Sequence, residues 1–368
     1  MSPASRSIVA TATLLAAVAI ASPAAANTIA QNVSWTIERE APVAKYRLTA
    51  YGDSLYAGYQ GSVSKVATWN APNVFGEYAS NHWNADIDII RRAKSGAKAD
   101  DIYDNKIVDD DEYMQHEDTR IVTFEMCGND GLQARNNLAG QDEGSTCDYS
   151  RLDEALADCT EYLEKAMIYI NANAHPEVKL KVVSNLYYPG YDDDDQLTDC
   201  DDAGTGTPVN RQDVFLENLA RSNWRTCNFA HQYGFECADT FAQFMGSDYD
   251  SNGDGHTDWR ALRYVHGESE NDYVQRLTED LRETIRDPNT KFINAKRSRD
   301  YIRSDNTHPT YRGGEVELGL LGGSGGGEGP PRFAPERYRR NFKNPIWRRF
   351  GHERFGRTLA LFTPATPN

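Results

Sequence analysis

Apolar and polar residues alternate in several short segments of the chain, which is the pattern of β-strands. Residues 46–50 and 86–93 alternate in this way, and residues 120–126 and 180–186 are rich in β-branched side chains. A period of two places successive side chains on opposite faces of a sheet, so each segment predicts a strand. We expect a further short strand at residues 291–294.

Between these segments, apolar residues recur at the spacing of an amphipathic helix. The clearest run extends from Leu152 to Ile170, and further helices are expected at residues 98–105, 214–232 and 273–285. Strands that alternate with such helices predict an α/β fold, a three-layer α/β/α sandwich around a parallel sheet. Ligands of these folds bind beyond the carboxyl ends of the strands.

The segment before residue 27 is typical of an export signal. Arg6 is the only charged residue before Glu38, an apolar run occupies residues 8–21, and Ala24-Ala25-Ala26 suits signal cleavage. The alternative interpretation is a membrane anchor, but the run is short and rich in alanine. We therefore expect residues 1–26 to be removed and the protein to be secreted or periplasmic, with no transmembrane segment elsewhere.

Composition excludes one class of partner and favours covalent cross-links. The formal net charge of −16 argues against a nucleic-acid partner for the main domain. All six cysteines follow the export signal, and an even number in an exported chain favours disulfides. Many pairings are possible, but Cys227 and Cys237 are close in sequence and flank an aromatic loop, so we favour that pair. The cysteine spacings match no zinc-binding pattern.

The main domain is expected to span residues 27–321 and to contain two insertions. Residues 187–212 hold seven aspartates and predict either a solvated loop or an acidic, cation-binding lid beside the ligand site; residues 246–268 form the second insertion. A glycine-rich linker at residues 322–331 leads to residues 332–368, where nine Lys or Arg residues face two Glu. This basic tail is either disordered or a contact for an acidic surface.

The second insertion contains a series of oxygen-bearing side chains that suits calcium. Such side chains alternate along the run, and Gly253 and Gly255 allow a tight turn. The run is similar to the short, EF-hand-like calcium loops of dockerins, and an acidic turn without metal is the alternative interpretation. The expected ligands, in a structural role, are Asp250, Asn252, Asp254 and Asp258, with Asp248 as a further candidate.

Candidate catalytic residues follow three of the predicted strands. Ser54 lies where the first predicted strand gives way to a turn, and Gly96 and Asn129 lie just past the next two strands. Because parallel strands end at one edge of a sheet, we expect these residues to lie close together. Farther along, Asp305 precedes His308 by three residues. A carboxylate so placed can orient the imidazole, which then takes a proton from a serine hydroxyl.

Four short blocks in this order resemble the SGNH/GDSL hydrolase family. The blocks are Gly52-Asp53-Ser54-Leu55, Ser95-Gly96-Ala97, Gly128-Asn129-Asp130 and Asp305-Asn306-Thr307-His308, over about residues 45–318. The resemblance implies a flavodoxin-like sandwich and a secreted esterase or lipase, with Ser54 as nucleophile, His308 as base and Asp305 as its orienting acid. It also implies an oxyanion hole made by the backbone N–H groups of Ser54 and Gly96 and the Asn129 amide.

The implied chemistry needs no cofactor, and the substrate would be a small-molecule, lipid or carbohydrate ester. An alternative from another class is a calcium-stabilised surface-binding or adhesion protein on an inactive hydrolase scaffold. The acidic composition, the calcium loop and the basic tail would suit that role. The order of the four blocks favours the esterase.

Overall fold

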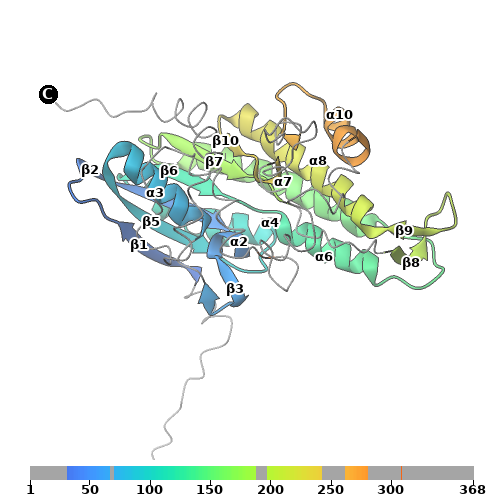
Figure 1. Cartoon of the computed structure of the whole chain (residues 1–368). Helices are drawn as coiled ribbons and strands as arrows, with labels where there is room; N and C mark the ends of the chain where they lie inside the picture. Colours follow the sequence, from blue (N-terminus) through green and yellow to red (C-terminus); the bar gives the residue numbers. More distant parts are fainter. Residues whose placement is uncertain (1–30, 67–69, 188–196, 243–261, 281–307, 309–368) are drawn as a thin grey trace, which may run out of the picture.

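A computed structural model of the chain describes residues 31–66, 70–187, 197–242, 262–280 and 308. Its centre is a six-stranded sheet with helices packed against it (Figure 1). In chain order the strands of this sheet are β1 (Val33–Ile37), β2 (Ala44–Gly52), β5 (Ala85–Ala93), β6 (Thr119–Phe124), β7 (Leu180–Ser184) and β10 (Glu236–Ala238). The strands predicted at residues 46–50, 86–93, 120–126 and 180–186 are therefore confirmed.

The strand order creates a switch point beside β2. Across the sheet the order is β1-β5-β2-β6-β7-β10, and every neighbouring pair except β1–β5 is parallel. Without β1 this is the flavodoxin-like order, in which the first strand lies between the second and the third. The predicted α/β/α sandwich with a parallel sheet is thus confirmed. The ligand edge that this order predicts is the one where β5, β2 and β6 end.

Strand β1 departs from the expected parallel arrangement. It pairs antiparallel with β5, from Val33 opposite Arg91 to Ile37 opposite Ile87. Residues 38–43 alone connect β1 to β2, whereas a connection between parallel strands takes about a dozen residues or more. The short connection therefore reverses the chain, and β1 runs opposite to both β2 and β5.

The main helices divide between the two faces of the sheet (Figure 1). Helix α3 (Ala71–Trp83) packs on the face that holds Ala50 of β2. Helices α7 (Ser150–Asn173) and α8 (Arg211–Tyr233) pack on the opposite face, which holds the next residue of the same strand, Tyr51. Because successive strand residues point to opposite sides, one short segment supplies the core of both layers.

The remaining described elements connect these layers. They are α2 (Ser54–Ala57), the hairpin of β3 (Tyr59–Ser62) and β4 (Lys65–Val66), α4 (Ala99–Ile102), which continues as the π-helical turn η1 (Tyr103–Val108), α5 (Glu112–Gln115), α6 (Gly128–Ala139), the hairpin of β8 (Leu197–Asp201) and β9 (Pro208–Asn210), and α10 (Glu270–Gln275), which continues as η3 (Arg276–Asp280). The helices predicted at residues 152–170 and 214–232 are confirmed. Those at residues 98–105 and 273–285 coincide with the α4–η1 and α10–η3 segments, as far as residue 280.

Three disulfides use all six cysteines. The pairs are Cys127–Cys159, Cys147–Cys200 and Cys227–Cys237. The favoured pair, Cys227 with Cys237, is therefore confirmed. Disulfides persist in oxidising compartments, so all three fit the expected extracellular location.

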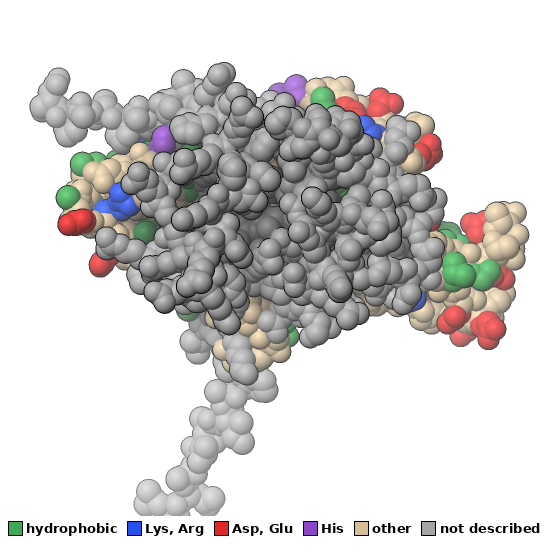
Figure 2. Space-filling view, viewed as in Figure 1, with side chains coloured by type: hydrophobic (Ala, Val, Ile, Leu, Met, Phe, Trp, Pro, Cys, Tyr) green, Lys and Arg blue, Asp and Glu red, His purple; other side chains and the backbone are tan. Residues whose placement is uncertain are grey.

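Part of the acidic insertion folds as the β8–β9 hairpin. The Cys147–Cys200 disulfide ties β8 to the segment before α7, and Thr146 forms a β-bridge with Asp201. Asp199 of β8 is exposed, and acidic side chains gather on the surface at the end of the molecule where β8 and β9 lie (Figure 2). The described part of the insertion is thus a cross-linked hairpin whose residues 203–208 are exposed. The choice between a solvated loop and a cation-binding lid stays a prediction.

Several predicted segments lie outside the described residues and stay predictions. They are the export signal at residues 1–26, residues 188–196 of the acidic insertion, most of the second insertion at residues 246–268, the strand at residues 291–294, the linker at residues 322–331 and the basic tail at residues 332–368. Among the described helices, none has the length together with the apolar character that a bilayer crossing requires.

One carboxyl group on α3 makes stability depend on pH. Burial raises the pKa of Glu77 to about 7, and the hydrogen bond that its Oε1 accepts from Asn73 at 3.0 Å offsets only part of this shift. Folding therefore favours the protonated form. Its contribution to stability is full below the ordinary pKa of 4.5 and is lost as the pH rises through about 7.

We expect Glu77→Gln to be more stable than wild type at about pH 8, by on the order of 2 kcal/mol, and nearly equal to it at about pH 4. Glutamine cannot ionise, but its oxygen still accepts from Asn73. Denaturant unfolding across this pH range measures the difference, with the exposed Glu143→Gln as the matched control. A difference between Glu77→Gln and wild type that stays constant with pH would contradict the assignment.

Candidate functional site

Ser54 lies at the carboxyl edge of the sheet, directly after β2. It opens the single turn of α2, and Asp53 caps that turn by accepting a hydrogen bond from the Leu55 N–H at 2.8 Å. The Ser54 hydroxyl donates to the same Asp53 oxygen over a longer distance of 3.4 Å. Gly58, with φ of +69°, then ends the turn in the left-handed conformation. The serine is thus presented on a short corner between a buried strand and β3.

Gly96 lies in the turn that follows β5, next to the end of β2. The Lys94 N–H donates to the Gly52 carbonyl at 3.0 Å, and the Ala97 N–H closes the turn on the Lys94 carbonyl at 3.1 Å. Gly96 has φ of +81°, and a Cβ added there would meet nothing within 4 Å. Backbone conformation, and not lack of space, therefore favours glycine at this position.

Asn129 joins these two loops. It lies in the first turn of α6, after β6, and its side-chain amide donates to Asp53 Oδ2 at 2.8 Å and to the Ala97 carbonyl at 2.9 Å. One hydrogen bond therefore reaches the Ser54 corner and the other reaches the Gly96 turn. Hydrogen bonds to Asp53 and Ala97 thus link Asn129 to the neighbours of Ser54 and of Gly96, at the switch point of the sheet.

Two backbone donors near the serine lack a protein acceptor among the described residues. Within the part of the chain that the structure describes, the N–H groups of Ser54 and Gly96 donate to no protein acceptor. Both amide hydrogens of Asn129, by contrast, are engaged. Backbone N–H groups next to a nucleophile are the means by which hydrolases stabilise a negatively charged oxygen.

Glu125 is a site residue that the sequence patterns did not single out. It follows β6, is 1% exposed, and its Oε1 accepts a hydrogen bond from the Asp53 N–H at 2.7 Å. A Cβ on Gly52 would lie 2.7 Å from the same oxygen, so the backbone before Ser54 packs directly on this carboxylate. A charged residue among apolar ones at the end of a predicted strand is the signal that could have identified it.

Two more side chains hydrogen-bond to the backbone around the Gly96 turn, and the sequence patterns gave neither of them a role. Gln31, just before β1, accepts from the Ser95 N–H at 2.6 Å and donates to the Ser95 hydroxyl at 2.8 Å. On the other side, Asp130 accepts from the Ala99 N–H at 3.0 Å. Burial raises the pKa of Asp130 to about 6. Both contacts join residues far apart in sequence, so no local sequence pattern predicts them.

His308 lies beside the strand that follows the Ser54 corner. Its ring packs against the ring of Tyr59 in β3, with centroids 4.2 Å apart and an interplanar angle of 35°. Asp305 lies outside the described residues. The contacts of His308 with Asp305 and with Ser54 stay predictions. The predicted calcium ligands also lie outside the described residues: Asp248, Asp250, Asn252, Asp254 and Asp258.

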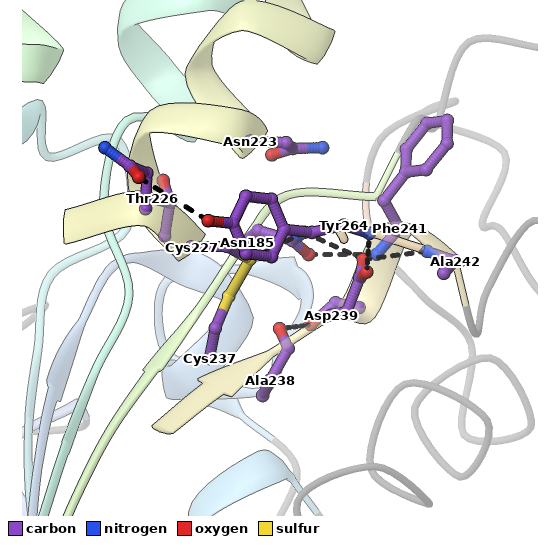
Figure 3. Close-up of a disulfide and its surroundings, with 12 residues drawn as sticks. Asn185, Asn223, Thr226, Cys227, Cys237, Ala238, Asp239, Phe241, Ala242 and Tyr264 are labelled. Carbon is purple, nitrogen blue, oxygen red and sulfur yellow. Dashed lines mark hydrogen bonds between the residues drawn. A yellow bond between two sulfur atoms is a disulfide. The ribbon is translucent and has the colours of Figure 1, made fainter. Parts of the chain in front are cut away.

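The loops after β7 and β10 hold polar residues that bond to one another (Figure 3). Asn185 donates to Asp239 at 2.9 Å and accepts from the Phe241 N–H at 3.0 Å. The second Asp239 oxygen accepts from the Tyr264 N–H at 2.8 Å. Asn223 of α8 bonds both the N–H and the carbonyl of the residue after Asn185. These side chains serve the fold, which leaves the loops after β2, β5 and β6 as the candidate site.

The chain is similar to several solved structures at low sequence identity. They include a lipase from a goat rumen metagenome (17% identity, TM-score 0.46, covering 75% of this chain and 95% of that one), phospholipase A1 from Streptomyces albidoflavus (18%, 0.45, 75% and 98%) and an acetylxylan esterase from Geobacillus stearothermophilus (11%, 0.42, 75% and 92%). No protein-family model matches the sequence, and no curated protein does.

Proposed function

We propose that this chain is a secreted serine hydrolase of the SGNH/GDSL type that cleaves carboxylic ester bonds through an acyl-enzyme on Ser54. The observation that carries the proposal is the buried Asp53 carboxylate, which accepts from the Leu55 N–H beside Ser54 and from the Asn129 amide. It holds a hydroxyl and a potential oxyanion donor in one unit at the switch point. The two available N–H groups nearby support the same chemistry.

In the proposed reaction, the Ser54 hydroxyl attacks the ester carbonyl and gives its proton to His308, which Asp305 orients. The carbonyl oxygen takes the negative charge, and the N–H groups of Ser54 and Gly96 donate to it. The alcohol then leaves with the proton held by His308, and the acyl group remains on Ser54. Finally, water gives a proton to His308 and attacks the acyl group. The bond to Ser54 then breaks, the Ser54 oxygen takes the proton back from His308, and the acid is released.

Asn129 would supply the third oxyanion donor after a local exchange. In the unliganded site its hydrogens go to the Asp53 carboxylate and to the Ala97 carbonyl. The bond to a carboxylate is the stronger of the two, because charge-assisted hydrogen bonds exceed neutral ones. The oxyanion therefore takes over the hydrogen that now goes to Ala97, while Asp53 keeps the amide in place.

A fluorophosphonate probe tests the proposal, because it reacts covalently with an activated serine. We expect wild type to gain one adduct, located on Ser54 by peptide mass spectrometry, and Ser54→Ala to gain none. The exposed Ser64→Ala is the matched control and should label like wild type. A wild type that stays unlabelled would favour the inactive, surface-binding alternative. A panel of acetyl, butyryl and long-chain esters with acetylated sugars then identifies the preferred acyl group.

We propose also that the second insertion binds calcium through Asp250, Asn252, Asp254 and Asp258. The described residues on either side of this run support a structural role for the metal. Phe241 and Ala242 before it are each 0% exposed, and Leu262 after it is 1% exposed, within one core cluster. A metal that fixed the run would therefore hold two buried anchors of the fold in place.

Removal of calcium with EDTA should lower the stability of wild type, and excess calcium should restore it. The expected gain is about 2.7 kcal/mol when free calcium is a hundred times its Kd, because the metal binds only the folded state. Thermal or denaturant unfolding measures it. Asp250→Ala/Asp254→Ala should lose the response, whereas Asp142→Ala/Glu143→Ala, which removes two exposed acids elsewhere, should keep it. Equal stability of wild type in EDTA and in calcium would refute the site.

A further inference from the structure

The corner between β6 and α6 has an unusual backbone conformation. Cys127, two residues before Asn129, has φ of +81°. Among the described residues, Asn84 is the only other non-glycine residue with a positive φ. In this region the Cβ of an L-residue crowds the neighbouring backbone, so residues other than glycine, asparagine and aspartate rarely stay there. Something outside the backbone must therefore hold Cys127 in place.

The Cys127 side chain supplies such a restraint through its disulfide bond. Cys127 is the N-cap residue of α6, but its side chain forms no capping hydrogen bond and is bonded instead to Cys159. Both cysteines are 3% exposed. The Cys127 carbonyl accepts from the Gly131 N–H at 3.3 Å, which starts the helix. The disulfide thus takes the place of a side-chain cap at the start of α6.

The other cysteine of this disulfide lies on a long helix that packs against the sheet. Cys159 is on the buried face of α7, between Leu156 and Leu163, and that helix runs for 24 residues across the sheet. A covalent bond from the middle of this helix to Cys127 restrains where the corner can move. A rigid helix is a better anchor than a loop for a geometry that a reaction depends on.

The position of the corner decides how Asn129 meets Asp53. A Cβ on Gly128 would lie 3.2 Å from Asp53 Oδ2, so the backbone at the start of α6 passes close to that carboxylate. The Asn129 amide reaches the same oxygen at 2.8 Å. A rotation about the Cys127 backbone would swing Gly128 and Asn129 together relative to the Ser54 corner.

We propose that the Cys127–Cys159 disulfide is a positioning device for Asn129, because it keeps Cys127 in the left-handed conformation that α6 requires at its start. Its effect on catalysis rests on the proposed function, in which Asn129 donates to the oxyanion. Small displacements of such groups are costly, since about 1 Å can cost on the order of a hundredfold in rate. Cys127 and Cys159 are positioning residues and take no part in the reaction itself.

Two double variants separate the backbone conformation from the cross-link. Cys127→Ala/Cys159→Ala removes the bridge and leaves a residue that avoids the left-handed region. Cys127→Gly/Cys159→Ala removes the same bridge but leaves a residue that adopts this region freely. We expect kcat for a p-nitrophenyl ester to fall about tenfold or more in the alanine variant, with KM nearly unchanged, and to recover most of the loss in the glycine variant.

Cys147→Ala/Cys200→Ala is the matched control, since that disulfide fixes the β8–β9 hairpin and packs with Ala134 and Leu138, in the later part of α6 and not at the corner where the helix starts. It should lower the thermal midpoint and leave kcat near wild type. Wild-type kcat in the alanine variant would overturn the proposal. Equal losses in the alanine and glycine variants would also overturn it, because the conformation at residue 127 would then not matter.

Hydrogen exchange of the Gly131 amide, measured far below the unfolding midpoint, gives a readout that does not depend on activity. This amide donates to the Cys127 carbonyl, so its protection reports the corner. Exchange should speed up in the alanine variant and stay near wild type in the glycine variant; unchanged exchange in both would overturn the proposal. Absence of Ser54-dependent turnover in wild type would defeat the proposed function alone, and the exchange result would still decide the role of the disulfide.

Discussion

Ser54→Ala is expected to lower kcat for ester hydrolysis by at least about 10⁴-fold, because the acyl-enzyme route disappears with the hydroxyl. Activity that remains would come from the oxyanion donors and substrate binding, which do not need the serine. The measurement is release of p-nitrophenol from a short-chain ester, with Ser64→Ala as the control. Turnover by Ser54→Ala at the wild-type rate would exclude Ser54 as the nucleophile.

The surroundings of Ser54 make this substitution a clean test. Its hydroxyl makes one described contact, the long hydrogen bond of 3.4 Å to Asp53. The Asp53 oxygen involved keeps its shorter bond from the Leu55 N–H at 2.8 Å, and its other oxygen keeps the bond from Asn129. No buried acceptor is left without a partner when the hydroxyl is removed. We therefore expect the thermal midpoint of Ser54→Ala to stay within a degree or so of wild type, which separates lost chemistry from lost folding.

Asn129→Ala is expected to lower kcat by about 10²–10³-fold with little change in KM, which is the usual cost of one oxyanion donor. Steady-state kinetics on the same ester measure the split between kcat and KM. The exposed Asn136→Ala on the same helix is the matched control and should keep wild-type kinetics. If Asn129→Ala raised KM and left kcat unchanged, the side chain would bind the substrate and not its transition state.

Asn129→Ala should also cost stability, in contrast to Ser54→Ala. The substitution takes a hydrogen-bond donor from Asp53 Oδ2, and Asp53 is only 2% exposed. Loss of one partner of a buried polar group costs roughly 1–3 kcal/mol. Kinetics must therefore be measured well below the lowered unfolding midpoint. A stable Asn129→Ala variant would indicate that Asp53 finds another donor in its place.

The sequence predicted the central strands of the sheet because their pattern is local. In β5, inward residues such as Ile87 and Ile89 alternate with polar ones along the segment itself. Other elements depend on distant partners. Helix α6 has two glycines and three asparagines, and helix α3 contains proline, glycine and two asparagines, so neither has a strong helical pattern. Strand β10 is three residues long and exists only as the partner of β7.

The residues of the candidate site likewise fall into two groups: those that a local pattern predicts and those that depend on contacts between distant segments. Ser54, Gly96 and Asn129 could be placed at one edge because each follows a strand with a readable pattern. The groups that hold them could not, because Glu125, Gln31 and Asp53 act across contacts between separate segments. The left-handed conformation of Cys127 could not be predicted from the sequence either, since cysteine has no preference for it and the disulfide that we propose holds it joins residues 32 positions apart.

The central place of β2 also constrains the order in which the protein can fold. The strand that leads to Ser54 pairs on one side with β5 and on the other with β6, and both follow it in the chain. Pairings between segments so far apart require closure of long loops before they contribute any stability, and chains that depend on them fold slowly. We therefore expect Ser54, the proposed nucleophile, to reach its final position only after β6 has docked. A partly folded chain would carry the serine without the ability to use it.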